Sequence, residues 1–264
     1  MSTSRRATLV TLLSTLAAGC GGGGDGSSAT SAMRGSITTT AITSQGNGMV
    51  YPLYVYLPPD STVDRASLPL VYLLDGESRF QTLVDIVEAT ASRIVIVGIG
   101  NEANRSHDYV PANSCTVNGG GQAAFFDFIR FELSPFVQAQ IGGDPTRRAL
   151  LGHSHGGSFV LYALFAEAAA AHHFSAYLAS DASIGCMTST VYGWESSYAT
   201  SNTALPVRLH ISYAANVDNE AFARQISSRN YTGLTLAAQL YPGGHIGMIT
   251  AAFPDAIRFA FVVT

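Results

Sequence analysis

The chain has 264 residues, of which 47% are hydrophobic and only 12% are charged. This composition fits one large globular α/β domain with a deep core and excludes an intrinsically disordered chain. The 14 basic residues are all arginine, the net charge is −4, and the arginines form no cluster that could follow a phosphate backbone. Nucleic acid is therefore excluded as a partner.

The first 35 residues have the pattern of an export signal followed by a tether. Arg5 and Arg6 precede an apolar run over residues 7–18, which is too short to span a bilayer, and "LAAGC" places Cys20 at its end. We expect residues 1–20 to be a signal peptide with a lipobox, Cys20 to be lipidated, and the Gly/Ser-rich residues 21–35 to be a flexible tether. The protein would then be an outer-membrane lipoprotein that faces the periplasm or the cell surface. Ordinary cleavage would instead make it periplasmic or secreted.

Short apolar runs alternate with helical stretches through the remaining chain, residues 36–264. Strands are predicted, in chain order, over residues 36–44, 51–59, 68–76, 93–100, 147–154, 174–180, 207–214 and 234–243. Helices are predicted over residues 80–91, 122–141, 154–171, 219–229 and 253–261.

This alternation predicts one α/β domain with a mostly parallel sheet covered by helices on both faces. The first two strands should form an antiparallel pair, and the continuous apolar runs that follow are typical of strands buried on both sides. The insertions are short, so no large cap domain is expected. Ligands of such sheets collect at the carboxyl ends of the strands.

The segment "LLGHSHGG" places Ser154 between an apolar strand and a helix. It matches the G-x-S-x-G nucleophile elbow, in which a sharp turn raises the serine above the sheet and small flanking residues avoid collisions. Ser154 is therefore the predicted nucleophile. The flanking His153 and His155 diverge across such a turn, so neither is expected to be its base, and no metal site or other cofactor is predicted.

The general base is predicted to be His245. It lies on a Gly-rich turn, "YPGGHIGM", directly after the last predicted strand, and histidine comes last in the triad order of this fold. The other histidines outside the elbow lie before the nucleophile, inside a strand or at the far end of a helix: His107, His172, His173 and His210.

The acid that orients the imidazole should follow the strand over residues 207–214. Asp218 in "ANVDNEAF" comes first after that strand and is the predicted acid. Glu220 in the same loop, Asp181 in "ASDAS", and a dyad without an acid are the alternatives. The oxyanion hole is predicted to use the backbone N–H of His155, and that of Glu77 in the turn after the strand over residues 68–76.

These motifs together resemble the Putative esterase family of α/β-hydrolases, which includes enterochelin esterases, feruloyl esterases and S-formylglutathione hydrolase. The resemblance is carried by "LVYLLDGES", "RSHDYVP", "LLGHSHGGSFVLYAL" and "YPGGHIGM". It implies an α/β-hydrolase fold and roles for Ser154 and His245 as nucleophile and base. The segment "ASDASIGC" departs from the family's usual Ser-Pro-Ser followed by aromatic residues.

Four further candidate residues lie in predicted loops. Arg105, in "RSHDYVP" at a strand's carboxyl end, either meets a polar or anionic substrate group or pairs with Asp108, and Tyr109 either borders the substrate or packs under the loop. Cys115 and Cys186 are an even pair in predicted loops of an exported chain, which favours a disulfide over two free core residues.

The sequence thus predicts a serine carboxylic-ester hydrolase that acts on a small-molecule ester through an acyl-enzyme and contacts membrane only through its lipid anchor. The alternatives are an acyltransferase that uses the same triad with an alcohol in place of water, and a non-catalytic, surface-anchored binding module.

Overall fold

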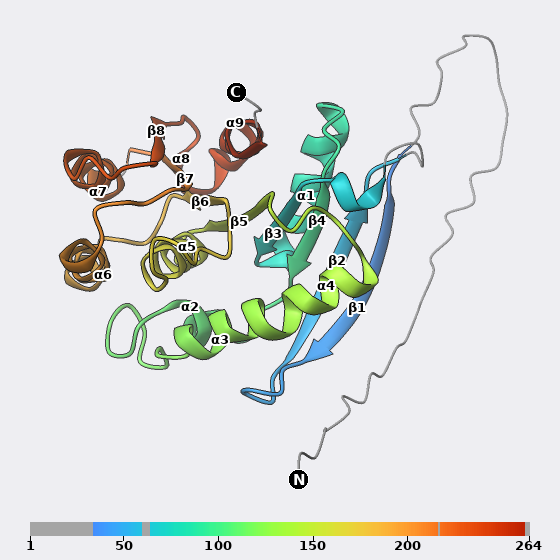
Figure 1. The fold of residues 1–264 in the computed structure, drawn as a ribbon, viewed down its shortest axis with the longest axis horizontal. Coiled ribbons are helices and arrows are strands. Elements are labelled where there is room, and N and C mark those ends of the chain that lie inside the picture. The colour runs from blue at the N-terminus through green and yellow to red at the C-terminus, as the bar shows by residue number, and fades with distance from the viewer. Residues whose placement is uncertain (1–33, 60–63, 216, 262–264) are drawn as a thin grey trace, which may run out of the picture.

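The computed structural model describes residues 34–59, 64–215 and 217–261 (Figure 1). The predicted signal peptide, Cys20 and the tether up to residue 33 lie outside these ranges, so their assignment stays a prediction. None of the helices in the described part is both long and apolar enough to cross a membrane.

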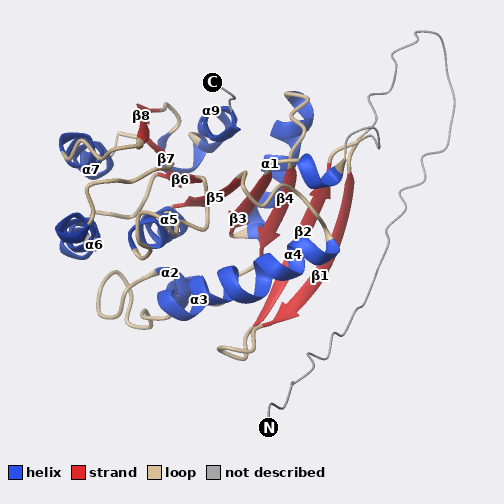
Figure 2. Ribbon diagram, in the orientation of Figure 1, coloured by secondary structure: helices blue, strands red, loops and turns tan. Residues whose placement is uncertain are grey.

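An eight-stranded sheet forms the centre of the molecule (Figure 2). Its strands are β1 (Ser36–Thr43), β2 (Val50–Leu57), β3 (Leu70–Leu74), β4 (Val95–Ile99), β5 (Arg148–His153), β6 (Ala176–Ser180), β7 (Arg208–Tyr213) and β8 (Thr235–Leu240). Their spatial order is β1-β2-β4-β3-β5-β6-β7-β8. The strands from β3 to β8 are mutually parallel, whereas β1 and β2 run antiparallel at one edge. The eight predicted strands and the antiparallel opening pair are confirmed.

Helices cover both faces of the sheet. They are α1 (Gly76–Ala89), α2 (Arg105–Tyr109), α3 (Gln122–Phe128), α4 (Ser134–Gln140), α5 (His155–Phe165), α6 (Thr188–Ser201), α7 (Val217–Ser228), α8 (Gly244–Gly247) and α9 (Ile249–Phe261). One layer consists of α1 and α9, which contact each other, and the other contains α2, α3, α5, α6 and α7. Figure 1 shows both layers edge-on.

Side chains of each buried strand alternate between these two layers, as the pleat requires. On β3, Val71 and Leu73 pack with Phe80 of α1 in one apolar cluster. Tyr72 and Leu74 face the opposite side and pack in the cluster that contains Phe159 of α5. The continuous apolar runs of the sequence therefore reflect burial on both faces.

The helices differ from the predictions at several points, and the short α2 and α8 were not predicted. The predicted helix over residues 122–141 contains a π-helical turn, Ile129–Leu133, between α3 and α4. Helix α5 ends at Phe165, because the buried Glu167 turns away to bind Arg130 and the N–H of His173. Helix α6 was not predicted, since its Ser, Thr and Tyr residues favour helix weakly.

Tertiary contacts hold α6 instead. Its Glu195 is fully buried and accepts hydrogen bonds from Arg229, Gln225 and Tyr231. These partners lie in α7 and in the chain that follows it, so the composition of the α6 segment alone could not predict this helix.

Candidate active site

Ser154 stands at a sharp turn between β5 and α5. Its backbone has φ 60° and ψ −123°, a conformation that non-glycine residues rarely adopt and that costs about 1–3 kcal/mol. A Cβ atom at Gly152 would lie 2.4 Å from the carbonyl oxygen of Gly156, and one at Gly157 would lie 2.8 Å from that of Ser180. The glycines are therefore required by close backbone approach, as the elbow motif predicts.

His245 and Asp181 lie together beside this turn. The Nδ1 atom of His245, in α8, is 2.6 Å from the Oδ2 atom of Asp181, which directly follows β6. Asp181 is 3% exposed, and its Oδ1 atom accepts a hydrogen bond from the N–H of Ala214. The carboxylate is thus fixed from two sides and leaves the Nε2 atom of His245 for proton transfer.

The prediction that Asp218 contacts His245 is wrong in this geometry. The structure places Asp218 in the first turn of α7, where its Oδ2 atom lies 2.7 Å from the position of a Cβ atom at Gly185. Glu220 forms an ion pair with Arg224 along the same helix. The sequence contained one signal for Asp181: it is the residue directly after the strand that neighbours β5.

Ser154, His153 and His245 line one cavity of about 310 Å³ at the carboxyl ends of the parallel strands. In the described structure the hydroxyl of Ser154 lies 3.2 Å from that of Ser183 and makes no hydrogen bond with His245. Catalytic hydrogen bonds are often long before substrate binds.

The two histidines beside Ser154 are in different surroundings. His153 is 2% exposed, and its ring lies 4.5 Å from that of His245, centroid to centroid. Burial lowers the pKa of His153 to about 3, with help from the positive charges of Arg79 and Arg105. Burial also lowers the pKa of His155. Both rings are therefore neutral near pH 7.

The N-terminal ends of α1 and α5 lie side by side. A Cβ atom at Gly156 would be 3.4 Å from the Oδ2 atom of Asp75, the residue that precedes α1. The first N–H groups of a helix have no partner within the helix, so this arrangement supports backbone donors from His155 and Glu77. The Glu77 carboxylate itself accepts hydrogen bonds from the N–H groups of Asn101 and Glu102.

Residues 44–229 match the model of a known family, described as Putative esterase. The match covers more than half of the chain and includes Ser154 and Asp181. The chain belongs to this family.

Relatives of the chain include two siderophore esterases. It is 36% identical over 141 residues to the siderophore triacetylfusarinine C esterase of Aspergillus fumigatus, covering 47% of each chain. It is 29% identical over 168 residues to the ferri-bacillibactin esterase BesA of Bacillus subtilis, covering 54% of this chain and 57% of that one. The aligned regions thus span about half the length of these relatives.

Among solved structures, an IroE-like serine hydrolase from Shewanella oneidensis has a TM-score of 0.76 and 26% identity, covering 87% of this chain and 82% of its own. The fold is therefore that of the α/β-hydrolases, as predicted, and no large cap domain is present in its described part.

In this member of the esterase family, the structure contradicts the predicted pairing of Arg105 with Asp108, whereas its predicted contact with a substrate group stays a prediction. Arg105 forms a two-point ion pair with Asp75, with nitrogen–oxygen distances of 3.0 and 3.1 Å, and not with Asp108. Tyr109 is fully buried and packs against Phe159, so it does not border the substrate cavity. Its hydroxyl accepts a hydrogen bond from the N–H of Asp75.

The predicted disulfide between Cys115 and Cys186 is present. It joins the loop after α2 to the segment that follows β6, five residues beyond Asp181. A ring nitrogen of His155 lies within 4.8 Å of both sulfur atoms. Because the sulfurs are bonded to each other, they offer no thiolate to a metal ion.

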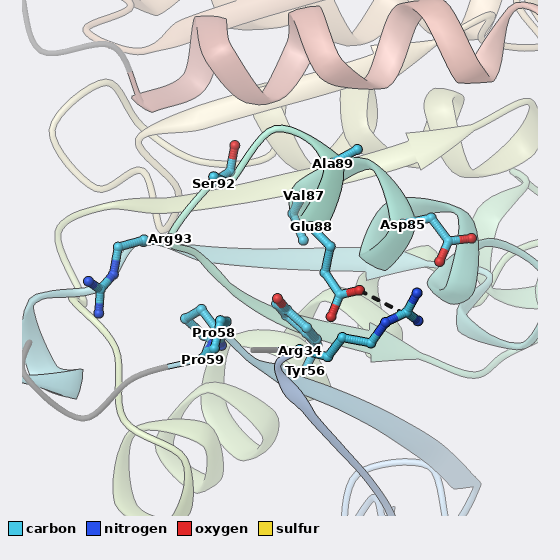
Figure 3. Close-up of a pocket in the computed structure, with 11 residues that line it drawn as sticks. Arg34, Tyr56, Pro58, Pro59, Asp85, Val87, Glu88, Ala89, Ser92 and Arg93 are labelled. Atoms are coloured by element: carbon cyan, nitrogen blue, oxygen red, sulfur yellow. Dashed lines mark ion pairs between the residues drawn. The ribbon is translucent and has the colours of Figure 1, made fainter. Parts of the chain in front are cut away.

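A larger cavity, of about 670 Å³, lies between the end of α1 and β2 (Figure 3). Figure 3 shows Glu88 reaching toward Arg34, and their charged atoms are 3.9 Å apart. The described residues that line this cavity include no histidine or cysteine. It is therefore not the candidate active site.

Proposed function

We propose that this protein is a serine carboxylic-ester hydrolase that works through an acyl-enzyme. The observation that carries the proposal is the combination of a strained Ser154 at the elbow with the His245–Asp181 pair in the same corner of the molecule. Family membership and the siderophore esterases among the relatives support it.

In the proposed reaction the Oγ atom of Ser154 attacks the ester carbonyl carbon while the Nε2 atom of His245 takes its proton. Asp181 stays ionised, holds His245 in the required tautomer and stabilises its positive form. The N–H groups of His155 and Glu77 donate to the oxyanion, and each such donor contributes about 2.7–4 kcal/mol.

Collapse of the tetrahedral intermediate breaks the bond to the alcohol, which leaves with the proton from His245. A water molecule then gives a proton to His245 and attacks the acyl group. The second collapse releases the carboxylic acid and returns the proton to Ser154.

We propose small-molecule esters as the substrates, with siderophore esters as the class that the relatives suggest. The cavity at Ser154 has mostly polar lining, and Ile246 is the only aliphatic residue among the described residues that form it. A panel of short-acyl, feruloyl and catecholate siderophore esters would rank these classes. Siderophore esters should then be cleaved with the highest kcat/KM.

We also propose export, because a disulfide is typical of an oxidising compartment. Lipidation at Cys20 would anchor the enzyme at the outer membrane. Expression with a labelled fatty acid should label the natural chain and leave Cys20→Ala unlabelled. Equal labelling, or none in either, would contradict the anchor.

The experiment that tests the proposed function is hydrolysis of 4-nitrophenyl acetate and butyrate by the natural protein and by Ser154→Ala. The variant should lose about 10⁶-fold in kcat, or fall to background. A folded natural protein without activity, or an active Ser154→Ala variant, would overturn the proposal.

A further inference from the structure

Arg79 lies in the wall of the cavity that contains Ser154 and His245. It belongs to the first turn of α1, four residues after Asp75, and is half-buried. Its positive charge is close enough to His153 to lower the pKa of that ring. The guanidinium therefore stands within the same small site as the nucleophile.

Two arginines are among the described residues that line this cavity, and within the described ranges only Arg105 has its charge neutralised. Arg105 is held at two points by Asp75. The backbone N–H of Arg79 donates to the carbonyl of Asp75, but its guanidinium makes no hydrogen bond or ion pair with any residue in the described ranges, and its Nε atom is buried without a partner. A buried polar atom without a partner is costly, so an unpaired guanidinium at a cavity favours a ligand that would satisfy it.

The described histidines and carboxylates around the cavity neither neutralise the positive charge of Arg79 nor add a second unpaired positive charge. His153 and His155 are neutral near pH 7, because burial lowers the pKa of each. Asp75 is engaged by Arg105, and the remaining carboxylate, Glu102, is exposed to solvent, which screens its charge. Within the described part of the chain, Arg79 is thus the cation beside Ser154 whose charge no other side chain compensates.

We propose that Arg79 is a specificity-determining residue that binds an anionic oxygen group of the ester substrate, such as a carboxylate. A guanidinium presents its donors in a planar fork that matches two oxygen atoms. The inference rests on the proposed ester hydrolysis and adds a substrate class to it: esters that carry a negative charge within a few atoms of the carbonyl.

The experiment compares matched esters that differ only in charge. Mono-4-nitrophenyl glutarate and 4-nitrophenyl pentanoate place the charge on the acyl side, and 4-acetoxybenzoate and its methyl ester place it on the leaving group. The measured quantity is the ratio of kcat/KM for the anionic ester to that for its neutral partner, after subtraction of the uncatalysed rate.

Arg79→Gln should lower this ratio about tenfold in at least one pair, since a charge-assisted hydrogen bond contributes about 1.5–3 kcal/mol and 1.4 kcal/mol is a factor of ten. Arg79→Lys should restore part of the loss. Arg224→Gln removes the same charge from the exposed face of α7 and should leave the ratio unchanged. Circular dichroism and the thermal midpoint verify that each variant is folded.

An unchanged ratio in Arg79→Gln for both pairs, or an equal fall in Arg224→Gln, would overturn the role of Arg79. If the natural protein cleaves none of the four esters nor any of the siderophore esters, the proposed function itself fails. If it cleaves the neutral esters and Arg79→Gln lowers both members of each pair equally, only this inference fails.

Discussion

The Oδ2 atom of Asp181 lies 2.6 Å from the Nδ1 atom of His245, although 64 residues separate them in the chain. They meet because Asp181 directly follows β6 and His245 follows β8, and parallel strands bring their carboxyl ends to one edge of the sheet. Ser154, which follows β5, is at that edge too. The parallel direction of the strands therefore brings the three residues together.

The elbow predicts a steric effect at Gly152. A Cβ atom there would collide with the Gly156 carbonyl at 2.4 Å, so Gly152→Ala should lower the free energy of unfolding by about 1–3 kcal/mol and reduce kcat. Gly193→Ala is the matched control, because nothing lies within 4 Å of a Cβ atom at that position on α6. Urea unfolding should show that the control is at least as stable as the natural protein. A similar loss in both variants would contradict the steric account.

The Arg105–Asp75 pair predicts that Arg105 stabilises the fold. Arg105→Gln leaves the carboxylate of Asp75, which is 5% exposed, without its cation and should cost about 3 kcal/mol of unfolding free energy. Asp75→Asn combined with Arg105→Gln should recover part of that loss in a double-mutant cycle. If the stability losses of the two single variants simply add in the double variant, the ion pair does not account for the loss.

Much of this arrangement could be predicted from the sequence. The strands, the elbow at Ser154 and the turn at His245 have local patterns, and each was found. Asp181 was only an alternative to Asp218 as the partner of His245, because its position depends on the bend after β6, where Asp181 adopts φ 39° and turns its carboxylate toward α8. The partner of Arg105 was missed for the same reason, since Asp75 comes from a different strand end.

The disulfide predicts a loss of stability on reduction. Cys115 and Cys186 are 71 residues apart, and a cross-link over such a loop contributes about 4 kcal/mol in the chain-entropy model. Dithiothreitol, or the paired change Cys115→Ser and Cys186→Ser, should lower the thermal midpoint by about 10 °C. Equal midpoints for oxidised and reduced protein would contradict this expectation.

His210 predicts how stability depends on pH. Burial beneath α9 lowers the pKa of His210 from 6.5 to about 4, so the unfolded chain takes up a proton at a higher pH than the folded protein does. The free energy of unfolding should therefore fall as the pH drops from about 6.5 to about 4, by on the order of 3 kcal/mol from this residue. Urea unfolding of His210→Leu across this range should show a shallower slope. An unchanged slope would contradict the assignment.

The measurement that tests the proposed triad most directly is kcat for 4-nitrophenyl butyrate with Asp181→Asn and with Asp218→Asn. Both changes are isosteric and remove one negative charge, but only Asp181 contacts His245 in this structure. Asp181→Asn should lose about 10⁴-fold in kcat, as expected when the imidazole is held in the wrong tautomer. Asp218→Asn should remain close to the natural protein. A large loss in Asp218→Asn with an active Asp181→Asn would contradict the account.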